Sequence, residues 1–167
     1  METKRVTRTD IPEIRTISRE AVEAAYDFLP DKERAATVRE RFSEERLETA
    51  LADDDVIIVA AIADGDPVGY AHVDVVNRAD AVGEARLQGI YVTPDRWRQG
   101  IGTALLDGIE DEIRTQGFTQ LSVSVLIDNE RGKRFFESKG FERVEERVED
   151  LFTGGTAYQQ VYYHDFA

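Results

Sequence analysis

The chain has 167 residues, of which 41% are hydrophobic, a composition typical of one globular domain with a sizeable buried core. It has no cysteine and only two histidines, which excludes a disulfide framework, a thiolate metal site and a cysteine nucleophile, and we expect no bound metal. Its formal net charge of −13 disfavours nucleic acid as a partner, because phosphate backbones require clustered positive charge.

The acidic balance has two interpretations. Asp and Glu total 34 against 21 Lys and Arg. The excess negative charge either draws a cationic substrate into an acidic cleft or forms a well-hydrated surface adapted to a high-salt cytoplasm. Net charge bears on solubility rather than on a site, so we favour the second, halophilic interpretation. No apolar run approaches the ~20 residues that span a bilayer, and the first ten residues lack the apolar segment of a signal peptide. A cytoplasmic protein without a membrane partner is therefore predicted.

The start of the chain predicts a short strand and then an amphipathic helix. Residues 4–8 have the character of a strand. Thr9 or Asp10 can cap the helix, and Pro12 falls in its first turn, where a missing N–H is harmless. Apolar residues then recur at helical spacing, at Ile14, Ile17, Ala21, Ala24 and Ala25.

The next part predicts more helix and then a β-hairpin. The sequence FLPD at residues 28–31 interrupts the first helix, and a charged helical region follows over residues 32–52. Ser43 is a suitable N-cap if that region is divided in two. Residues 56–76 contain two β-rich runs that flank Asp64-Gly65, a strong signal for a hairpin turn.

The second half of the chain alternates strands and helices, so the order β-α-α-β-β-β-α-β-α-β-β predicts a mixed sheet in an α/β fold. The strand over residues 83–93 ends before Pro94, and the helix that follows runs to about Gln116, with Gly117 at the C′ position. The remaining elements are a strand over 120–127, a helix over 129–139 closed by Gly140, and two strands around Gly154-Gly155.

The segment PDRWRQGIGTALL, residues 94–106, follows a strand and opens a helix. Gly100 and Gly102 are poor helix residues, but amides at a helix start lack intrahelical partners and carry partial positive charge. Glycines let these amides approach a ligand with no Cβ in the way, and Arg98 adds a full positive charge. The segment predicts a site for a phosphate or diphosphate, and a tight turn that binds nothing is the simpler alternative.

Other phosphate-binding motifs do not fit this segment. The chain lacks G-x-x-x-x-G-K-[ST], so a P-loop NTPase is not supported. The sequence GIGTAL lacks the third glycine of a dinucleotide-binding turn, and it follows a hairpin instead of the first strand. The diphosphate ligand therefore has to be identified from a wider pattern.

That wider pattern resembles the GNAT superfamily of acetyl-CoA-dependent N-acetyltransferases. LQGIYVTPDRWRQGIGTALL (residues 87–106) is similar to the family's l-Y-V-x-P strand and [RQ]-x-x-G-x-[GA] loop, and NERGKRFFESKGFE (residues 129–142) to its N-x-x-A-x-x-F-Y-x-x-x-G-F helix. The resemblance is good over residues 84–141, looser from residue 56 and only topological before that. It implies one N-acetyltransferase domain over residues 1–167, with a twisted, mostly antiparallel sheet of about seven strands and about four helices.

The resemblance also implies which residues bind acetyl-CoA as co-substrate. Main-chain groups of the strand would pair with the pantetheine arm, the glycine loop would surround the diphosphate, and the later helix would line the other side. Asn129 is equally well explained as a helix N-cap. The implied binding residues are Ile90, Tyr91, Val92, Arg98, Gln99, Gly100, Ile101, Gly102, Thr103, Asn129 and Phe136.

Two positions depart from the family pattern. Trp97 stands where the family has Arg or Gln, three residues before the first glycine. Binding through backbone amides survives this change. Phe136 stands where the family often has a tyrosine that acts as general acid, and a phenyl ring cannot protonate a leaving thiolate. The second change keeps open the alternative that the chain is an acetyl-CoA-binding sensor with little transferase activity.

The reaction that the resemblance implies is direct attack of an amine on the thioester in a ternary complex. Backbone N–H groups where the strand over 83–93 diverges from its neighbour can polarise the carbonyl, and a thiol pKa of about 8.5 makes the thiolate a tolerable leaving group. Glu84 and Asp74 are candidate bases, and solvated strand carboxylates are the alternative interpretation of both. Tyr91 is a candidate proton donor, since it is the tyrosine nearest in sequence to the thioester.

The acceptor is the least legible part of the sequence. In this family it is set by the first two helices, the loop between them and the last strands, here AAYDFLPDKE and TGGTAYQQVYY. Their acidic and aromatic residues suit an amine on a small molecule, a peptide or a protein. The family also implies a homodimer through the C-terminal strands.

Overall fold

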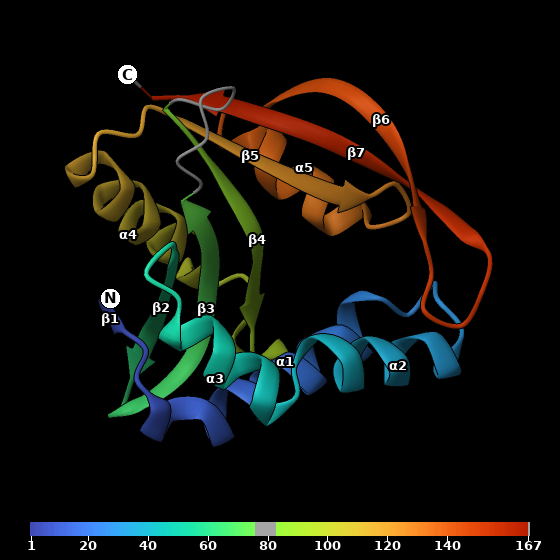
Figure 1. The fold of residues 1–167 in the computed structure, drawn as a ribbon, viewed down its shortest axis with the longest axis horizontal. Coiled ribbons are helices and arrows are strands. Elements are labelled where there is room, and N and C mark those ends of the chain that lie inside the picture. Colours follow the sequence, from blue (N-terminus) through green and yellow to red (C-terminus); the bar gives the residue numbers. More distant parts are fainter. Residues whose placement is uncertain (76–82, 167) are drawn as a thin grey trace.

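The computed structural model describes residues 1–75 and 83–166 (Figure 1). Val76, the last residue of the predicted β-rich segment, lies outside the described residues. The strands are β1 (Glu2–Arg5), β2 (Val56–Ala63), β3 (Asp66–Val75), β4 (Glu84–Val92), β5 (Gln120–Leu126), β6 (Glu142–Asp150) and β7 (Thr156–Asp165). The α-helices are α1 (Ile11–Ala25), α2 (Asp31–Arg41), α3 (Glu44–Ala52), α4 (Ile101–Thr115) and α5 (Glu130–Ser138), with short 3₁₀ helices η1 (Arg8–Asp10) and η2 (Pro94–Arg96).

The strands form one seven-stranded sheet in the order β1-β2-β3-β4-β5-β7-β6. β4 and β5 are parallel, and the other neighbouring pairs in this described sheet are antiparallel. The predicted α/β class with a mixed, mostly antiparallel sheet is therefore confirmed.

The helix count differs from the expectation, since the described residues contain five α-helices instead of about four. The charged region over residues 32–52 is two helices, α2 and α3. The division falls at Ser43, whose hydroxyl accepts a hydrogen bond from the Arg46 amide at 3.1 Å. This N-cap starts a separate helix, so the chain has three α-helices, not two, before β2.

Helices cover both faces of the sheet, and β2 shows why its sequence is apolar throughout. Ile57 and Val59 pack in the core beneath α4, whereas Ile58 and Ala60 pack with α1 and α3 on the opposite face. Successive side chains of a strand point to opposite faces, so a strand covered on both sides reads as a continuous apolar run. On α4 the predicted apolar stripe is buried, with Ile101, Leu105, Ile109 and Ile113 at most 2% exposed.

The predicted turns form for the expected reasons. Asp64 and Gly65 both have positive φ, 54° and 85°, as a two-residue type I′ hairpin turn requires. Gly117 has φ 87° just after α4, and the amide that follows it bonds to the Ile113 carbonyl at 3.0 Å. The first strand is shifted, because residues 2–5 pair with β2 in place of the predicted 4–8.

Within residues 1–75 and 83–166, no helix has the length and apolar character needed to cross a membrane.

Candidate active site

The parallel strands β4 and β5 separate halfway along their length. Their pairing begins at Glu84 and stops at Leu87, which lies opposite Val123. A bulge follows at Gln88, where the register of β4 against β3 shifts. Residues 88–92 therefore run on without pairing to β5, and a cleft of about 680 Å³ lies there, along the diverging strands seen in Figure 1.

The glycine loop forms one wall of this cleft and leads directly into α4. Gly100 is the N-cap of α4 with φ 81°, and Arg98 has φ 65°. The Ala104 amide bonds to the Gly100 carbonyl at 3.0 Å, so the amides of residues 101–103 precede the first bond within the helix. A Cβ at Gly102 would lie 3.1 Å from the Phe135 ring. The loop is thus a cradle of backbone amides that suits a diphosphate.

Helix α5 forms the opposite wall. Asn129 is its N-cap, and the side-chain oxygen accepts a hydrogen bond from the Gly132 amide at 3.0 Å. A Cβ at Gly132 would lie 2.7 Å from the Asn129 side-chain nitrogen and 3.1 Å from Val125, so glycine leaves room for this cap and for the close approach of α5 to β5. Phe136 is 6% exposed, lines the cleft and packs edge-to-face on Phe141, with the ring centroids 5.2 Å apart.

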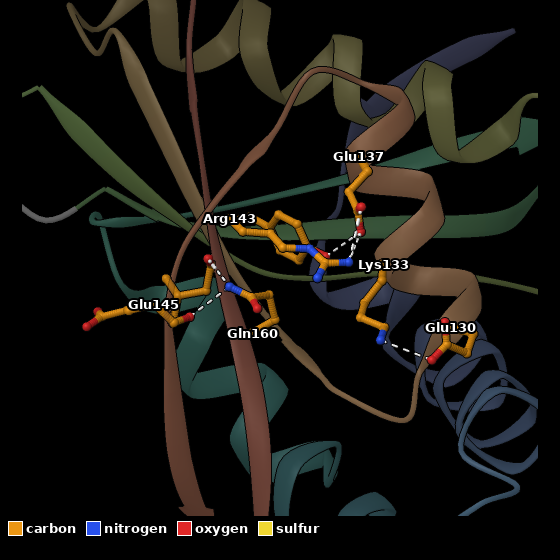
Figure 2. A network of polar contacts seen from close by, with 8 residues as sticks. Glu130, Lys133, Glu137, Arg143, Glu145 and Gln160 are labelled. Carbon is orange, nitrogen blue, oxygen red and sulfur yellow. Dashed lines mark hydrogen bonds and ion pairs between the residues drawn. The ribbon is translucent and has the colours of Figure 1, made fainter.

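A polar network fixes the far side of α5 to the last two strands (Figure 2). Glu137 on α5 accepts hydrogen bonds from the Tyr162 hydroxyl at 2.7 Å and from Arg143 at 3.0 Å. Burial and the Glu137 carboxylate raise the pKa of Tyr162 to about 12, so its hydroxyl keeps the proton that makes this bond. Gln160 on β7 donates a hydrogen bond to the Glu145 carbonyl on β6 at 2.8 Å, which adds a polar contact between these two strands.

Trp97 and Arg131 meet across the mouth of the cleft. The indole Nε1 donates to the Val92 carbonyl at 2.9 Å, which fixes the ring beside the end of β4. The Arg131 guanidinium, on α5, lies 3.9 Å from the ring centroid, within cation–π range. Both side chains line the cleft. Arg131 thus places a positive charge beside Trp97, supplied by α5 instead of the glycine loop.

The other end of the cleft lies between α2 and the β6–β7 hairpin. Arg41 on α2 forms an ion pair with Glu149 on β6 at 3.0 Å, and it also interacts with the Tyr91 hydroxyl. Burial raises the pKa of Tyr91 well above its ordinary value, although Arg41 lowers it in part, so the phenol stays protonated at neutral pH. We call the lining residues within 26–41 and 149–152 the hairpin half of the cleft, and those within 88–103 and 129–136 the glycine-loop half.

Glu33 closes the hairpin half from α2. It is 2% exposed, and it accepts hydrogen bonds from the Phe152 amide at 3.0 Å and from the Thr153 amide at 2.9 Å and hydroxyl at 2.7 Å. Burial alone raises the pKa of this carboxyl, but the bonds from Thr153 and Phe152 outweigh it and hold the pKa below the usual range.

Most of the residues expected to bind acetyl-CoA line this cleft. They are Ile90, Tyr91, Val92, Arg98, Gly100, Ile101, Gly102, Thr103, Asn129 and Phe136. Gln99 is not among the lining residues, since its exposed side chain turns back to the Asp95 carbonyl at 3.4 Å.

The candidate bases require a correction. Glu84 is not brought to the cleft, because it starts β4, at the opposite end from the unpaired residues, and interacts there with Tyr163. Asp74 does not line the cleft either, since it binds His72 at 3.2 Å and Gln88 at 2.6 Å on the sheet. Neither carboxylate lines the cleft, and Asp74 reaches it only through Gln88.

Glu33, Arg41 and Glu149 are among the charged cleft residues that were not predicted. The Arg41–Glu149 ion pair and the hydrogen bonds to Glu33 each join α2 to residues more than 100 positions later in the chain. No local spacing could have indicated these pairs. The only available signal was the likeness of the first helices and last strands to the family's acceptor-binding segments.

This sheet, opened between two parallel strands beside a glycine-bearing helix start, defines a coenzyme-binding transferase fold. The model of the Acetyltransferase (GNAT) family matches residues 16–141. The chain belongs to this family and is an acetyltransferase with acetyl-CoA as its acetyl donor.

Individual relatives agree with this assignment. The chain is 31% identical over 109 residues to an aminoglycoside N(6′)-acetyltransferase type 1 of Stenotrophomonas maltophilia, covering 62% of this chain and 71% of that protein. It is 41% identical over 58 residues to the [ribosomal protein bS18]-alanine N-acetyltransferase of Escherichia coli, or 35% of this chain and 39% of the relative.

Solved structures share the fold. The PaiA N-acetyltransferase of Thermoplasma acidophilum, in complex with coenzyme A, superposes with a TM-score of 0.83 at 20% identity over 99% of this chain and 98% of its own. The ribosomal-protein-S18-alanine N-acetyltransferase of Escherichia coli gives 0.75 at 23% identity over 99% and 94%.

Proposed function

We propose that this acetyltransferase transfers the acetyl group of acetyl-CoA to a primary amine, of a small molecule or of a peptide or protein, by direct attack in a ternary complex. The observation that carries the proposal is a single cleft that runs from the glycine loop, past the unpaired end of β4, to Arg41 and Glu149. Coenzyme and amine can therefore approach the same stretch of β4 from opposite ends.

The glycine-loop half would bind the coenzyme. The amides ahead of α4 would hold the diphosphate, with Arg98 and Arg131 beside it. Main-chain groups of residues 88–92 would pair with the pantetheine arm in place of the missing β5 partner, and their N–H groups would polarise the thioester carbonyl. Phe136 would pack against the arm, since its ring offers no proton.

The hairpin half would bind and activate the amine. The nitrogen forms a bond to the acetyl carbon while the carbon–sulfur bond breaks, and the electron pair leaves with sulfur as the thiolate. We assign the proton of the attacking amine to the Glu149 carboxylate, which replaces Glu84 as the candidate base. Tyr91 would act as a hydrogen-bond donor instead of a general acid, because a phenol with a raised pKa holds its proton against a thiolate.

Two assays test this function and separate it from a coenzyme sensor. Trp97 is the only tryptophan, and it lies at the cleft mouth, so its fluorescence should change on titration with acetyl-CoA. Release of free thiol should then be measured over a panel of amines that includes an aminoglycoside and a peptide with N-terminal alanine. Binding of acetyl-CoA without thiol release from any amine would favour the sensor and contradict the proposed transfer.

We also propose that residues 1–167 form one domain, that two copies associate through β6 and β7, and that the acidic surface suits high salt. Light scattering measures the assembly directly. The melting temperature should rise with salt concentration, and a value indifferent to molar salt would remove the halophilic interpretation. The transfer assay should be run at both low and molar salt for the same reason.

A further inference from the structure

Glu33 is a buried carboxylate that the proposed chemistry does not use. Burying a charged group is unfavourable unless hydrogen bonds replace those lost to water. Here the replacements come from two residues of one turn, Phe152 and Thr153, at 2.7–3.0 Å. Such bonds to a carboxylate are stronger than those between neutral groups. The charge on α2 is therefore stabilised by the turn between β6 and β7.

The turn itself contains little that would fix its position against α2. Gly154 and Gly155 have φ values of 102° and 84°, and a Cβ at either position would meet nothing within 4 Å. The Leu151 amide bonds to the Gly155 carbonyl at 3.0 Å, which closes the turn on itself but does not orient it. The other contacts with α2 that hold this end of the hairpin, among the described residues, come from Arg41, which pairs with Glu149 just before the turn at 3.0 Å and whose guanidinium lies 5.7 Å from the Phe152 ring centroid.

Both sides of this contact line the cleft. On α2 the residues facing it are Glu33, Thr37 and Arg41, spaced four apart along one side of the helix. From the turn come Leu151 and Phe152. The turn is thus a wall of the hairpin half, and its distance from α2 sets the width of that half.

We propose that Glu33 is a positioning residue: it holds the β6–β7 turn against α2 and thereby limits the bulk of the amine that the hairpin half admits. This inference rests on the proposed function. Glu33 accepts hydrogen bonds from the turn with both oxygens, whereas Glu149 lines the cleft and is paired with Arg41 and Gln159, so these two carboxylates have separate roles.

The test compares Glu33→Gln with Glu40→Gln, which alters an exposed carboxylate on the same helix. Kinetics over primary amines of graded bulk should show the KM of slender amines rising about tenfold in Glu33→Gln, because orientation of the bound amine is lost. Bulky amines should lose less or gain, and coenzyme affinity should stay within about twofold. Thr153→Val removes only the hydroxyl donor and should raise the KM of slender amines by less. Thr153→Ser keeps the donor and should leave that KM at the wild-type value.

Hydrogen exchange gives a readout that does not depend on activity. The amides of Phe152 and Thr153 should exchange at least about tenfold faster in Glu33→Gln than in wild type or Glu40→Gln. Unchanged exchange, or an amine preference that shifts equally in both variants, would overturn the proposal. If the wild type binds coenzyme but acetylates no amine, the proposed function fails, and amine binding measured by calorimetry with coenzyme A present then decides whether Glu33 controls the acceptor.

Discussion

The two halves of the cleft differ in which chemical groups form them and in how far apart those groups lie in the sequence. The glycine-loop half comes from two continuous segments, residues 88–103 and 129–136, and the groups proposed to hold the diphosphate and the pantetheine arm there are main-chain groups. The hairpin half consists of side chains on α2 that meet β6 and its turn, with contacts 108 to 120 residues apart in sequence. A site made of backbone depends on local conformation, whereas a site made of distant side chains depends on how the elements pack.

The largest expected effect comes from a substitution that disrupts the glycine-loop half alone. Gly100→Val should weaken acetyl-CoA binding by at least about 100-fold, because a Cβ branch at φ 81° forces the loop out of the left-handed region and disperses its amides. Tryptophan fluorescence titration measures the affinity.

Gly117→Val is the matched control for that change. It has φ 87° and equally open space, but it follows the C-terminus of α4, far along the helix from the loop. It should reduce stability by a similar amount and leave coenzyme affinity intact. Equal loss of affinity in both variants would mean that the loop acts through general stability and not as a cradle.

The next largest effect comes from a substitution in the hairpin half. Glu149→Gln should lower kcat/KM for the amine by about 10- to 100-fold, the range expected for loss of a base, while acetyl-CoA affinity is retained. Glu146→Gln, an exposed carboxylate on the same strand, serves as the control in the thiol-release assay. Wild-type rates in Glu149→Gln would remove Glu149 from the proposed mechanism.

A smaller effect on acetyl-CoA affinity is expected from a single side chain of the glycine-loop half, Arg131. Arg131→Ala should weaken acetyl-CoA binding by about fivefold, since it removes a positive charge and a cation–π contact of about 1 kcal/mol with Trp97. Arg134→Ala, exposed on the same helix and outside the cleft lining, should change the affinity less. Calorimetry is the preferred measurement here, because the substitution alters the fluorescence of the indole itself.

The smallest effect is on the pH dependence of stability. The pKa of Glu33 is lowered in the folded chain, so its ionised form adds stability above the unfolded value of about 4.5, and that stability is lost as the pH falls through the lower folded value. Glu33→Gln should therefore show a flatter dependence of unfolding free energy on pH below about 4.5 than wild type. Parallel curves from urea unfolding would contradict the assigned hydrogen bonds.

The sequence by itself determined much of the fold and the glycine-loop half. The apolar stripe on α4, the Asp64-Gly65 turn, the Ser43 cap and the cradle at Gly100 follow from propensities and spacings within a few residues. Such features depend on φ, ψ and local hydrogen bonds, which neighbouring residues largely specify. The division of the region over residues 32–52 was visible in the sequence for the same reason.

Only the tertiary structure decided the hairpin half and the candidate base. Glu84 and Glu149 are both strand carboxylates, and sequence alone does not show which of them lies in the cleft. The choice depends on where β4 parts from β5 and on which face of β6 approaches α2. Those relations arise from the packing of elements that are distant in sequence, by 108 residues for Arg41 on α2 and Glu149 on β6, so no local pattern encodes which carboxylate lies in the cleft.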